Sequence, residues 1–233
     1  MNTKIADRLQ SALETINKAA QSVNRQPNEI RLLAVSKTKP ASMVQEAWQA
    51  GQRAFGENYV QEGLQKIQDC QSLTDIEWHL IGPLQSNKCK PVAAHFDWVQ
   101  SVDRHKIAQR LNDNRPQSLA PLNVCLQINI SGESSKSGLN TAEVKSLAEA
   151  IHKSMPQLCL RGLMAIPSNT EDDIKLAEEF KQMQGLFSQL QQSYDTVDTL
   201  SMGMSGDMAL AIANGSTMVR VGTAIFGARS PKQ

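Results

Sequence analysis

Short runs of β-branched and aliphatic residues alternate with amphipathic stretches along almost the whole chain of 233 residues. This alternation predicts a parallel sheet whose strands are joined by crossover helices. Eight runs are candidate strands: Arg31–Lys37, Ala54–Asn58, Glu77–Gly82, Trp98–Val102, Val124–Ile130, Leu160–Ile166, Thr199–Met204 and Thr217–Phe226. Because eight repeats leave no second block of sequence, the pattern favours an α/β fold of the closed (β/α)8 or TIM-barrel type.

A further helix is expected ahead of the first strand, over residues 1–24, because apolar residues recur there at spacings of three and four. The face that they form contains Ile5, Leu9, Leu13 and Ile16. The barrel is expected over residues 31–227. Together with this N-terminal helix it would form a single domain of residues 1–233.

Two of the connecting helices are the clearest, at Thr141–Lys153, where Thr141 is the expected cap, and at Glu171–Ser193. A doubly wound open sheet is the alternative architecture. It usually carries a Gly-x-Gly-x-x-Gly motif after its first strand, whereas residues 37–40 here are Lys-Thr-Lys-Pro.

The composition excludes several classes of function. The 24 basic and 23 acidic residues give a net charge of +1, so we expect no binding to nucleic acid or to an anionic membrane. Apolar runs fall short of the ~18 residues that span a bilayer, and Met1–Arg8 contains no apolar signal core, which predicts a cytoplasmic protein. The cysteines and histidines show no metal-ligand spacing, so no metal site is expected.

Lys37 closes the first predicted strand. Side chains alternate along a strand, so Lys37 shares a face with Leu33 and Val35. If those two fill the barrel interior, Lys37 points inward at the carboxyl ends of the strands, where such barrels carry their sites. Desolvation there would lower the pKa of its amine and make it a nucleophile. The alternatives are a lysine that extends to the rim or pairs with a carboxylate, and Lys39 as the reactive residue.

Two glycine-containing segments near the end of the chain suggest an anion site. Ser201–Asp207 leads from the seventh strand into a helix with Ser205 as the expected N-cap, and Gly222 and Thr223 follow in the eighth strand. N–H groups at such a helix start favour phosphate, and barrels often bind phosphate between the loops after strands seven and eight. The alternative is a capped helix without a ligand, in which Asp207 serves only the helix dipole.

Three more polar residues are candidates for the same site. Arg220 lies within the eighth strand and needs an acceptor, either in a structural ion pair or on the ring nitrogen of a bound heterocycle. Asn58, at the end of the second strand, either bonds the same ligand or is a turn residue. Lys136 lies in the polar segment Ser131–Gly138, which is either a lid over the mouth or a solvated loop.

Six longer motifs occur in order over nearly the whole chain: Leu33–Pro40, Phe55–Glu62, Trp78–Lys88, Leu163–Pro167, Leu200–Ser205 and Gly215–Gly227. In these motifs the chain resembles the pyridoxal phosphate homeostasis protein family. The resemblance implies a single-domain barrel that binds pyridoxal 5′-phosphate (PLP), similar to the N-terminal domain of alanine racemases, known as fold type III.

The resemblance also implies roles for individual residues. The family's lysine that carries PLP as a Schiff base corresponds to Lys37. The residues that bind the phosphate correspond to Ser205, Gly222 and Thr223. This chain departs from the family at Gly206, where relatives often carry a polar residue, and the departure concerns the details of the phosphate loop.

The remaining cofactor contacts implied by the resemblance are Arg220 at the ring nitrogen and Asn58. Two functions are then open. The family resemblance favours a PLP carrier that takes part in PLP homeostasis and releases the cofactor to apo PLP-dependent enzymes. The polar, glycine-flanked loop at the predicted mouth adds Lys136 as a secondary PLP lysine. The alternative is a PLP-dependent amino-acid racemase.

A two-base racemase needs a second acid/base group opposite the lysine. Alanine racemases supply a tyrosine from a β-rich second domain, whereas this sequence has only Tyr59 and Tyr194 and ends at Gln233. An arginine does not protonate the ring nitrogen, which restrains carbanion chemistry. We therefore expect a monomeric PLP carrier without substantial catalytic activity.

Overall fold

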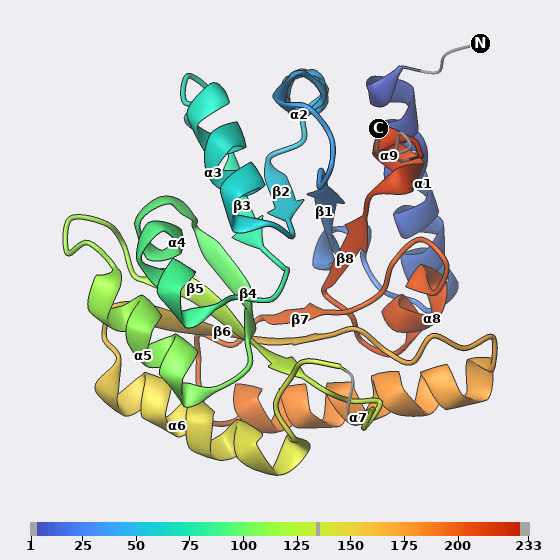
Figure 1. Cartoon of the computed structure of the whole chain (residues 1–233). Helices are drawn as coiled ribbons and strands as arrows, with labels where there is room; N and C mark the ends of the chain where they lie inside the picture. Colours follow the sequence, from blue (N-terminus) through green and yellow to red (C-terminus); the bar gives the residue numbers. More distant parts are fainter. Residues whose placement is uncertain (1–3, 134–135, 229–233) are drawn as a thin grey trace.

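The structure, a computed structural model, describes residues 4–133 and 136–228. Eight parallel strands close into a barrel in chain order, and β1 pairs with β8 to complete it (Figure 1). The strands are β1 Arg31–Val35, β2 Ala54–Glu57, β3 Glu77–Leu80, β4 Trp98–Val102, β5 Leu122–Ile128, β6 Leu158–Ala165, β7 Thr199–Ser201 and β8 Met218–Val221. The expected (β/α)8 barrel is confirmed.

Helices surround the barrel and connect its strands. The α-helices of the described chain are α1 Ile5–Ser22, α2 Ala41–Gln49, α3 Val60–Asp69, α4 Cys89–His95, α5 His105–Asn114, α6 Val144–Ser154, α7 Asp173–Gln191, α8 Met208–Ala213 and α9 Thr223–Phe226. Three short 3-10 turns, η1 Pro27–Glu29, η2 Ser86–Lys88 and η3 Thr141–Glu143, precede strands or helices. Figure 1 shows α1 beside α8 and α9, so the first and last helices meet on one side of the barrel.

Alternation along β1 separates two apolar layers. Leu32 and Ala34 belong to the large cluster between the strands and the helices, whereas Leu33 packs with Ala54 and Met218 in a small separate cluster. Because β1 lies beside both β2 and β8, this second cluster lies inside the barrel. The inward direction expected for Leu33 is therefore confirmed.

The N-terminal helix forms as expected, apart from its buried face. The helix observed is Ile5–Ser22, and residues 1–3 of the expected range lie outside the described residues. Ala12 and Ala20 join Ile5, Leu9 and Ile16 on the buried side, whereas Leu13 is exposed. At 100° per residue Leu13 lies at the edge of this stripe, which explains why its expected burial is wrong.

The start of the helix expected at Thr141–Lys153 is capped by a different residue from the one predicted. Asn140, not Thr141, caps the η3–α6 segment, because its side chain accepts the Ala142 N–H at 3.1 Å and Glu143 closes a capping box. The helix expected at Glu171–Ser193 is α7, Asp173–Gln191, and Asp172 caps it by accepting the N–H groups of Ile174 and Lys175.

The eighth strand is shorter than expected. It ends at Val221, and Thr223–Phe226, expected to be strand, is the helix α9. An apolar run this short fits either structure, and packing against α1 selects the helix.

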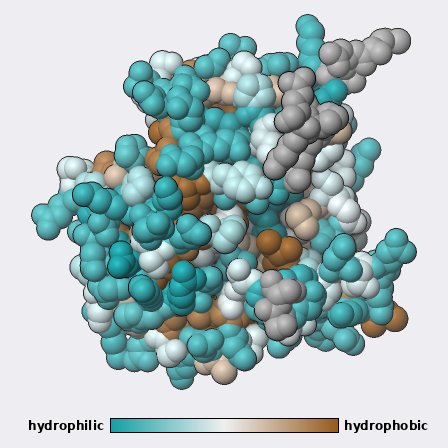
Figure 2. Space-filling model, in the orientation of Figure 1, coloured by the Kyte–Doolittle hydropathy of each residue, from teal (hydrophilic) through white to brown (hydrophobic). Residues whose placement is uncertain are grey.

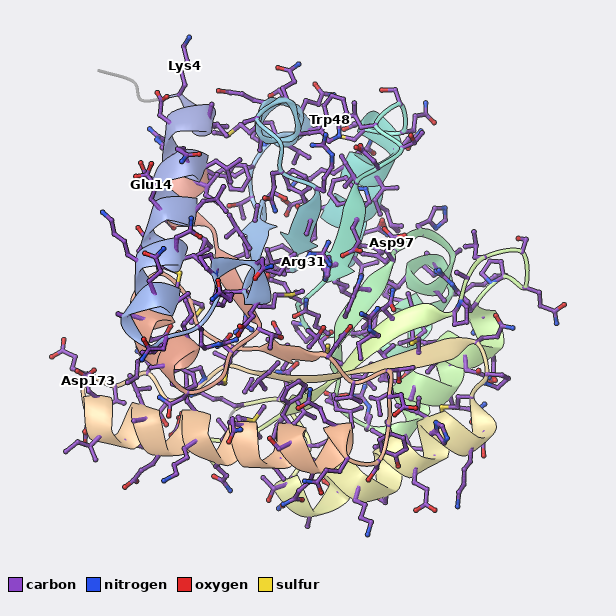
Figure 3. All side chains as sticks on the ribbon, turned by 180° about the vertical axis from the view of Figure 1, so that it is seen from behind. Lys4, Glu14, Arg31, Trp48, Asp97 and Asp173 are labelled. Atoms are coloured by element: carbon purple, nitrogen blue, oxygen red, sulfur yellow. The ribbon has the colours of Figure 1, made fainter. Side chains whose placement is uncertain are left out.

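Some charged side chains lie at the outside of the molecule and others lie at the starts of barrel strands. Seen from behind, Lys4 just before α1, Glu14 on α1 and Asp173 at the start of α7 lie at the outside, whereas Arg31 begins β1 and Asp97 directly precedes β4 (Figure 3). Hydrophilic residues cover most of the face in Figure 2. No helix within residues 4–133 and 136–228 is both long and apolar enough to cross a membrane.

Candidate functional site

A cavity of about 340 Å³ opens at the carboxyl ends of the strands. Apolar side chains from several strand ends form much of its wall. They belong to Val35, Ile81, Met164, Ile166 and Met204. The structure brings all six residues expected at the main site to the same cavity: Lys37, Asn58, Ser205, Arg220, Gly222 and Thr223.

Lys37 lies two residues beyond β1 in a turn, and its side chain is half-buried. The strand thus ends at Val35, earlier than expected. The Thr38 N–H donates to Glu62 Oε1 at 2.5 Å, and Thr38 takes a φ of 63°, which is unusual for a residue other than glycine. The backbone on both sides of Lys37 is therefore tightly held.

A buried charged cluster supports this turn from below. Lys66 on α3 donates to the Ser36 carbonyl at 2.7 Å, to Glu57 Oε1 at 2.8 Å and to Glu62 Oε1 at 2.6 Å. The Ser36 hydroxyl also donates to Glu57 Oε1 at 2.6 Å. Burial raises the pKa of Glu57, and the nearby ammonium group of Lys66 opposes that rise.

Sequence patterns alone did not reveal this buried cluster. Its one local signal is the spacing of four residues between Glu62 and Lys66, which places an acid and a base on the same face of a helix. The involvement of Glu57 depends on how α3 packs against β2, and sequence spacing does not show it.

Arg220 is buried in β8 and points its guanidinium group toward polar backbone. Its Nη1 donates to the carbonyl and the hydroxyl of Ser201 at 2.8 and 2.9 Å, and its Nη2 donates to the Ala165 carbonyl at 2.8 Å. Burial lowers the pKa of Arg220 to about 10, so the group stays charged at neutral pH. Among the described residues its hydrogen-bond acceptors are neutral oxygens and it has no ion pair, so the structural ion pair considered from the sequence is not found there.

The segment expected to cap α8 has a different role from the one predicted. Ser205 and Gly206 are exposed in a turn, and Asp207 is the N-cap residue of a helix that begins at Met208. The Met204 N–H donates to Asp207 Oδ1 at 2.6 Å, which stabilises this turn. Ser205 is therefore available at the rim of the cavity instead of being used by the helix.

Gly222 lies in the cavity wall close to Val35, where a side chain would be crowded. A Cβ atom added there would lie 3.2 Å from the Val35 carbonyl oxygen, and the next residue, Thr223, is exposed at the first position of α9. At Gly206 an added Cβ would meet no atom within 4 Å. Two glycine-bordered turns thus face the same space from neighbouring strand ends.

Asn58 directly follows β2 and contributes a buried acceptor to the cavity wall. Its Oδ1 atom has no hydrogen-bond partner among the described residues. A buried carbonyl without a donor costs free energy, so this atom favours a ligand that brings a donor.

Lys136 lies next to this cavity and not in it. Its Nζ donates to Glu133 Oε1 at 2.8 Å and to the Pro167 carbonyl at 2.9 Å. It lines an adjoining cavity of about 200 Å³ that shares Asn58, Ile81 and Ile166 with the first. Residues 134–135 of the expected lid lie outside the described residues. No group of three or more metal-ligating side chains occurs in the described part of the chain.

Comparison with known proteins identifies the family. A family model described as "Alanine racemase, N-terminal domain" matches residues 8–230. The pyridoxal phosphate homeostasis protein of Escherichia coli (strain K12) is 57% identical over 227 residues, which cover 97% of each chain. The chain belongs to the pyridoxal phosphate homeostasis protein family. A member from Vibrio alginolyticus is 58% identical over 212 residues, covering 90% of this chain and 91% of that protein.

Solved structures of other proteins share the fold of this chain. PipY of Synechococcus elongatus PCC7942, in a structure with PLP bound, is 37% identical, with a TM-score of 0.80 over 96% of this chain and 100% of that one. Alanine racemase from Corynebacterium glutamicum is 15% identical, with a TM-score of 0.73 over 96% of this chain and 62% of that chain. The racemase shares the barrel fold with this homeostasis-family chain.

Proposed function

We propose that this chain binds PLP at the mouth of the barrel, holds it and releases it to other proteins as part of PLP homeostasis. The observation that carries the proposal is the convergence of six polar and glycine positions on one cavity. Its volume of about 340 Å³ lies within the range of small-ligand sites, roughly 300–1,000 Å³. The PLP bound in the PipY structure supports the same ligand.

The residues present fit this cofactor. The unpartnered Oδ1 of Asn58 favours a ligand with a donor group, and the charged Arg220 suits an acceptor such as a ring nitrogen. The exposed Ser205 and Thr223, with the open backbone at Gly222, suit a phosphate because hydroxyl and N–H donors bind anions. When bound, PLP supplies a carbonyl carbon to which an amine bonds with release of water.

Lys37 is the residue that would form that bond. It lines the cavity between the Val35 wall and the turns at Ser205 and Gly222, and its turn is fixed by the buried Lys66 cluster. Lys136 is a second candidate, because it lines the adjoining cavity. There it could accept PLP transiently during release.

The arrangement favours a carrier without substantial catalytic activity. Arg220 keeps its own proton at neutral pH and so does not protonate a ring nitrogen. Tyr59 is 57% exposed and does not line the cavity, so it is poorly placed as an opposing base. The cytoplasmic location, the monomeric state and the transfer to apo PLP-dependent enzymes stay predictions.

The proposal is tested by the visible absorption of the chain mixed with PLP. The wild-type chain and Lys39→Ala should show a visible absorption band that free PLP lacks. Lys37→Ala should not show this band. Lys39 is a matched control because its Nζ donates to the Ala228 carbonyl outside the cavity. Loss of the band in Lys39→Ala and its retention in Lys37→Ala would contradict the assignment.

A further inference from the structure

A continuous line of polar side chains runs through the barrel interior and ends at Arg220. The Arg220 Nη1 lies 2.9 Å from Ser201 Oγ, which lies 2.6 Å from Gln100 Oε1. Gln100 Nε2 lies 2.9 Å from His79 Nδ1, and His79 Nε2 lies 2.6 Å from Glu77 Oε1. Glu77 is the first residue of β3, so the line connects the cavity with the opposite end of the barrel.

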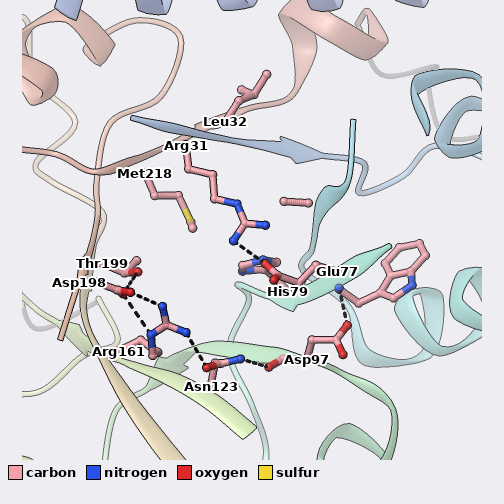
Figure 4. A network of polar contacts seen from close by, with 12 residues as sticks. Arg31, Leu32, Glu77, His79, Asp97, Asn123, Arg161, Asp198, Thr199 and Met218 are labelled. Carbon is pink, nitrogen blue, oxygen red and sulfur yellow. Dashed lines mark hydrogen bonds and ion pairs between the residues drawn. The ribbon is translucent and has the colours of Figure 1, made fainter. Parts of the chain in front are cut away.

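The far end of the line carries a fixed negative charge. Arg31, the first residue of β1, pairs with Glu77 at 2.7 Å beside His79 (Figure 4). Burial favours the neutral acid at Glu77, but the hydrogen bond from His79 and the charge of Arg31 oppose that effect and lower the pKa of Glu77 below its usual value. The carboxylate therefore accepts, and His79 Nε2 must donate to it.

The direction of every other hydrogen bond follows from that one. Burial lowers the pKa of His79, so the ring is neutral and its Nδ1 accepts a hydrogen bond from the Gln100 amide. The Gln100 oxygen then accepts from the Ser201 hydroxyl, and the Ser201 oxygen accepts from Arg220. Along this line each group donates to the next one, from the cationic guanidinium group to the carboxylate.

The side-chain amide of Gln100, at the centre of the line, has only one orientation that satisfies its neighbours. Gln100 also donates its second N–H to the Met218 sulfur at 3.2 Å, so both ends of the amide are occupied. A flipped amide would face the His79 lone pair with an oxygen and the Ser201 hydroxyl with a donor. Gln100, His79 and Ser201 are all fully buried, so no bulk water can replace a lost partner.

Some N–H groups of the Arg220 guanidinium are not used by the line of polar side chains. Both Nη1 hydrogens are directed at Ser201 and one Nη2 hydrogen at Ala165. Within the described part of the chain, the Nε–H and the other Nη2–H of Arg220 bond to no protein acceptor, and Arg220 lines the cavity wall.

We propose that Gln100, His79 and Glu77 are positioning residues for Arg220, and that they aim its unused N–H groups at the ring nitrogen of the bound ligand. The inference rests on the proposed function, because it takes PLP as the ligand. These residues touch neither the cavity nor the ligand and act only through Ser201.

The test compares PLP with an analogue that has a carbon atom in place of the ring nitrogen. Both ligands are titrated by fluorescence or absorption into the wild type, His79→Phe, His79→Asn and Ser101→Ala. Phenylalanine keeps a ring to stack on Trp98, which lies 4.9 Å from the His79 ring, but it has neither donor nor acceptor. Ser101 is the matched control, a buried residue of β4 next to Gln100 whose hydroxyl has no partner among the described residues.

The wild type should bind PLP more tightly than the analogue. In His79→Phe the affinity for PLP should fall about threefold to tenfold, the effect of one lost hydrogen bond in a network, while the affinity for the analogue stays within about twofold. His79→Asn, whose amide can still accept from Gln100, should recover part of the preference. Ser101→Ala should keep all of it.

The ratio of the two affinities is measured within each variant, so a general loss of stability cancels. If His79→Phe does not fold, Gln100→Met replaces it as the variant that interrupts the line. Equal weakening of both ligands, or a wild type that binds both equally, overturns the inference and leaves PLP binding intact. A wild type that binds neither ligand overturns the proposed function as well.

Discussion

Replacing Lys66 by methionine removes the cation that pairs with Glu57 and Glu62 in the buried cluster below the Lys37 turn. In the wild type, Lys66 is 5% exposed and holds Glu57, which is fully buried, together with the Ser36 carbonyl. Methionine has a similar length but no charge, so the carboxylate of Glu57 loses its ion pair. The change isolates the electrostatic contribution of Lys66 while the shape of the site is largely kept.

The size of the effect follows from the lost contacts. Three hydrogen bonds to or from charged groups disappear, each worth roughly 1.5–3 kcal/mol. Part of this is recovered, because Glu62 is 26% exposed and can be hydrated, and because Glu57 can take up a proton. We therefore expect the free energy of unfolding to fall by about 3–5 kcal/mol, as for other broken buried pairs.

The loss should depend on pH. Burial already raises the pKa of Glu57, and without Lys66 it should rise further. A carboxyl whose pKa is raised in the folded state binds its proton more tightly there, so its contribution to stability is lost as pH rises through the folded pKa. Lys66→Met should therefore be less stable at pH 8 than at pH 5, and its deficit relative to the wild type should grow over the same interval.

Urea unfolding followed by circular dichroism at both pH values measures this effect. Lys153→Met is the matched control, since Lys153 also pairs with a glutamate four residues away, but with its side chain 66% exposed. The control should change stability very little at either pH. A Lys66→Met variant no less stable than the control, or one whose deficit is larger at pH 5, would refute the reasoning.

Three other outcomes are expected. Pyridoxal without its phosphate should bind at least about tenfold more weakly than PLP, because each lost hydrogen bond to the charged group costs roughly 1.5–3 kcal/mol; equal affinities in a titration would contradict the phosphate site. Lys136→Ala should leave the affinity for PLP nearly unchanged but alter the rate of its transfer to an apoenzyme, and an unchanged rate would remove that role. The PLP-loaded chain should not exchange the α-hydrogen of amino acids at the ~10 s⁻¹ typical of enzymes; deuterium incorporation at that rate, absent from Lys37→Ala and from free PLP, would show catalysis.

The barrel and the members of the site could be predicted from the sequence for one physical reason. Strands of a closed parallel barrel all end at the same mouth, so residues at or just beyond the carboxyl ends of the strands converge there even when they are far apart in the chain. Lys37 and Gly222, separated by most of the sequence, line one cavity for this reason. The single domain over residues 1–233 and the role of each site residue stay predictions.

The local sequence did not predict where some helices and strands begin and end. Thr223–Phe226 is apolar enough for a strand, and only its packing against α1 makes it the helix α9. Ser205 and Asp207 are both good N-cap residues, and the position where α8 starts selects Asp207.

The polar interior could not be predicted at all. Whether His79, Gln100 and Ser201 meet depends on the register of strands on different sides of the barrel, which no spacing along the chain records. The same holds for Glu57, which lies in β2 next to the candidate residue Asn58 and whose partner Lys66 comes from the following helix.

The most direct test of the central claim is to find where the cofactor is attached. The chain is loaded with PLP, reduced with borohydride, digested and mapped by mass spectrometry. We expect the pyridoxyl group on the peptide that contains Lys37 and expect Lys39 and Lys136 to be largely unmodified at stoichiometric PLP. A pyridoxyl group mainly on another lysine of the intact chain would contradict the account.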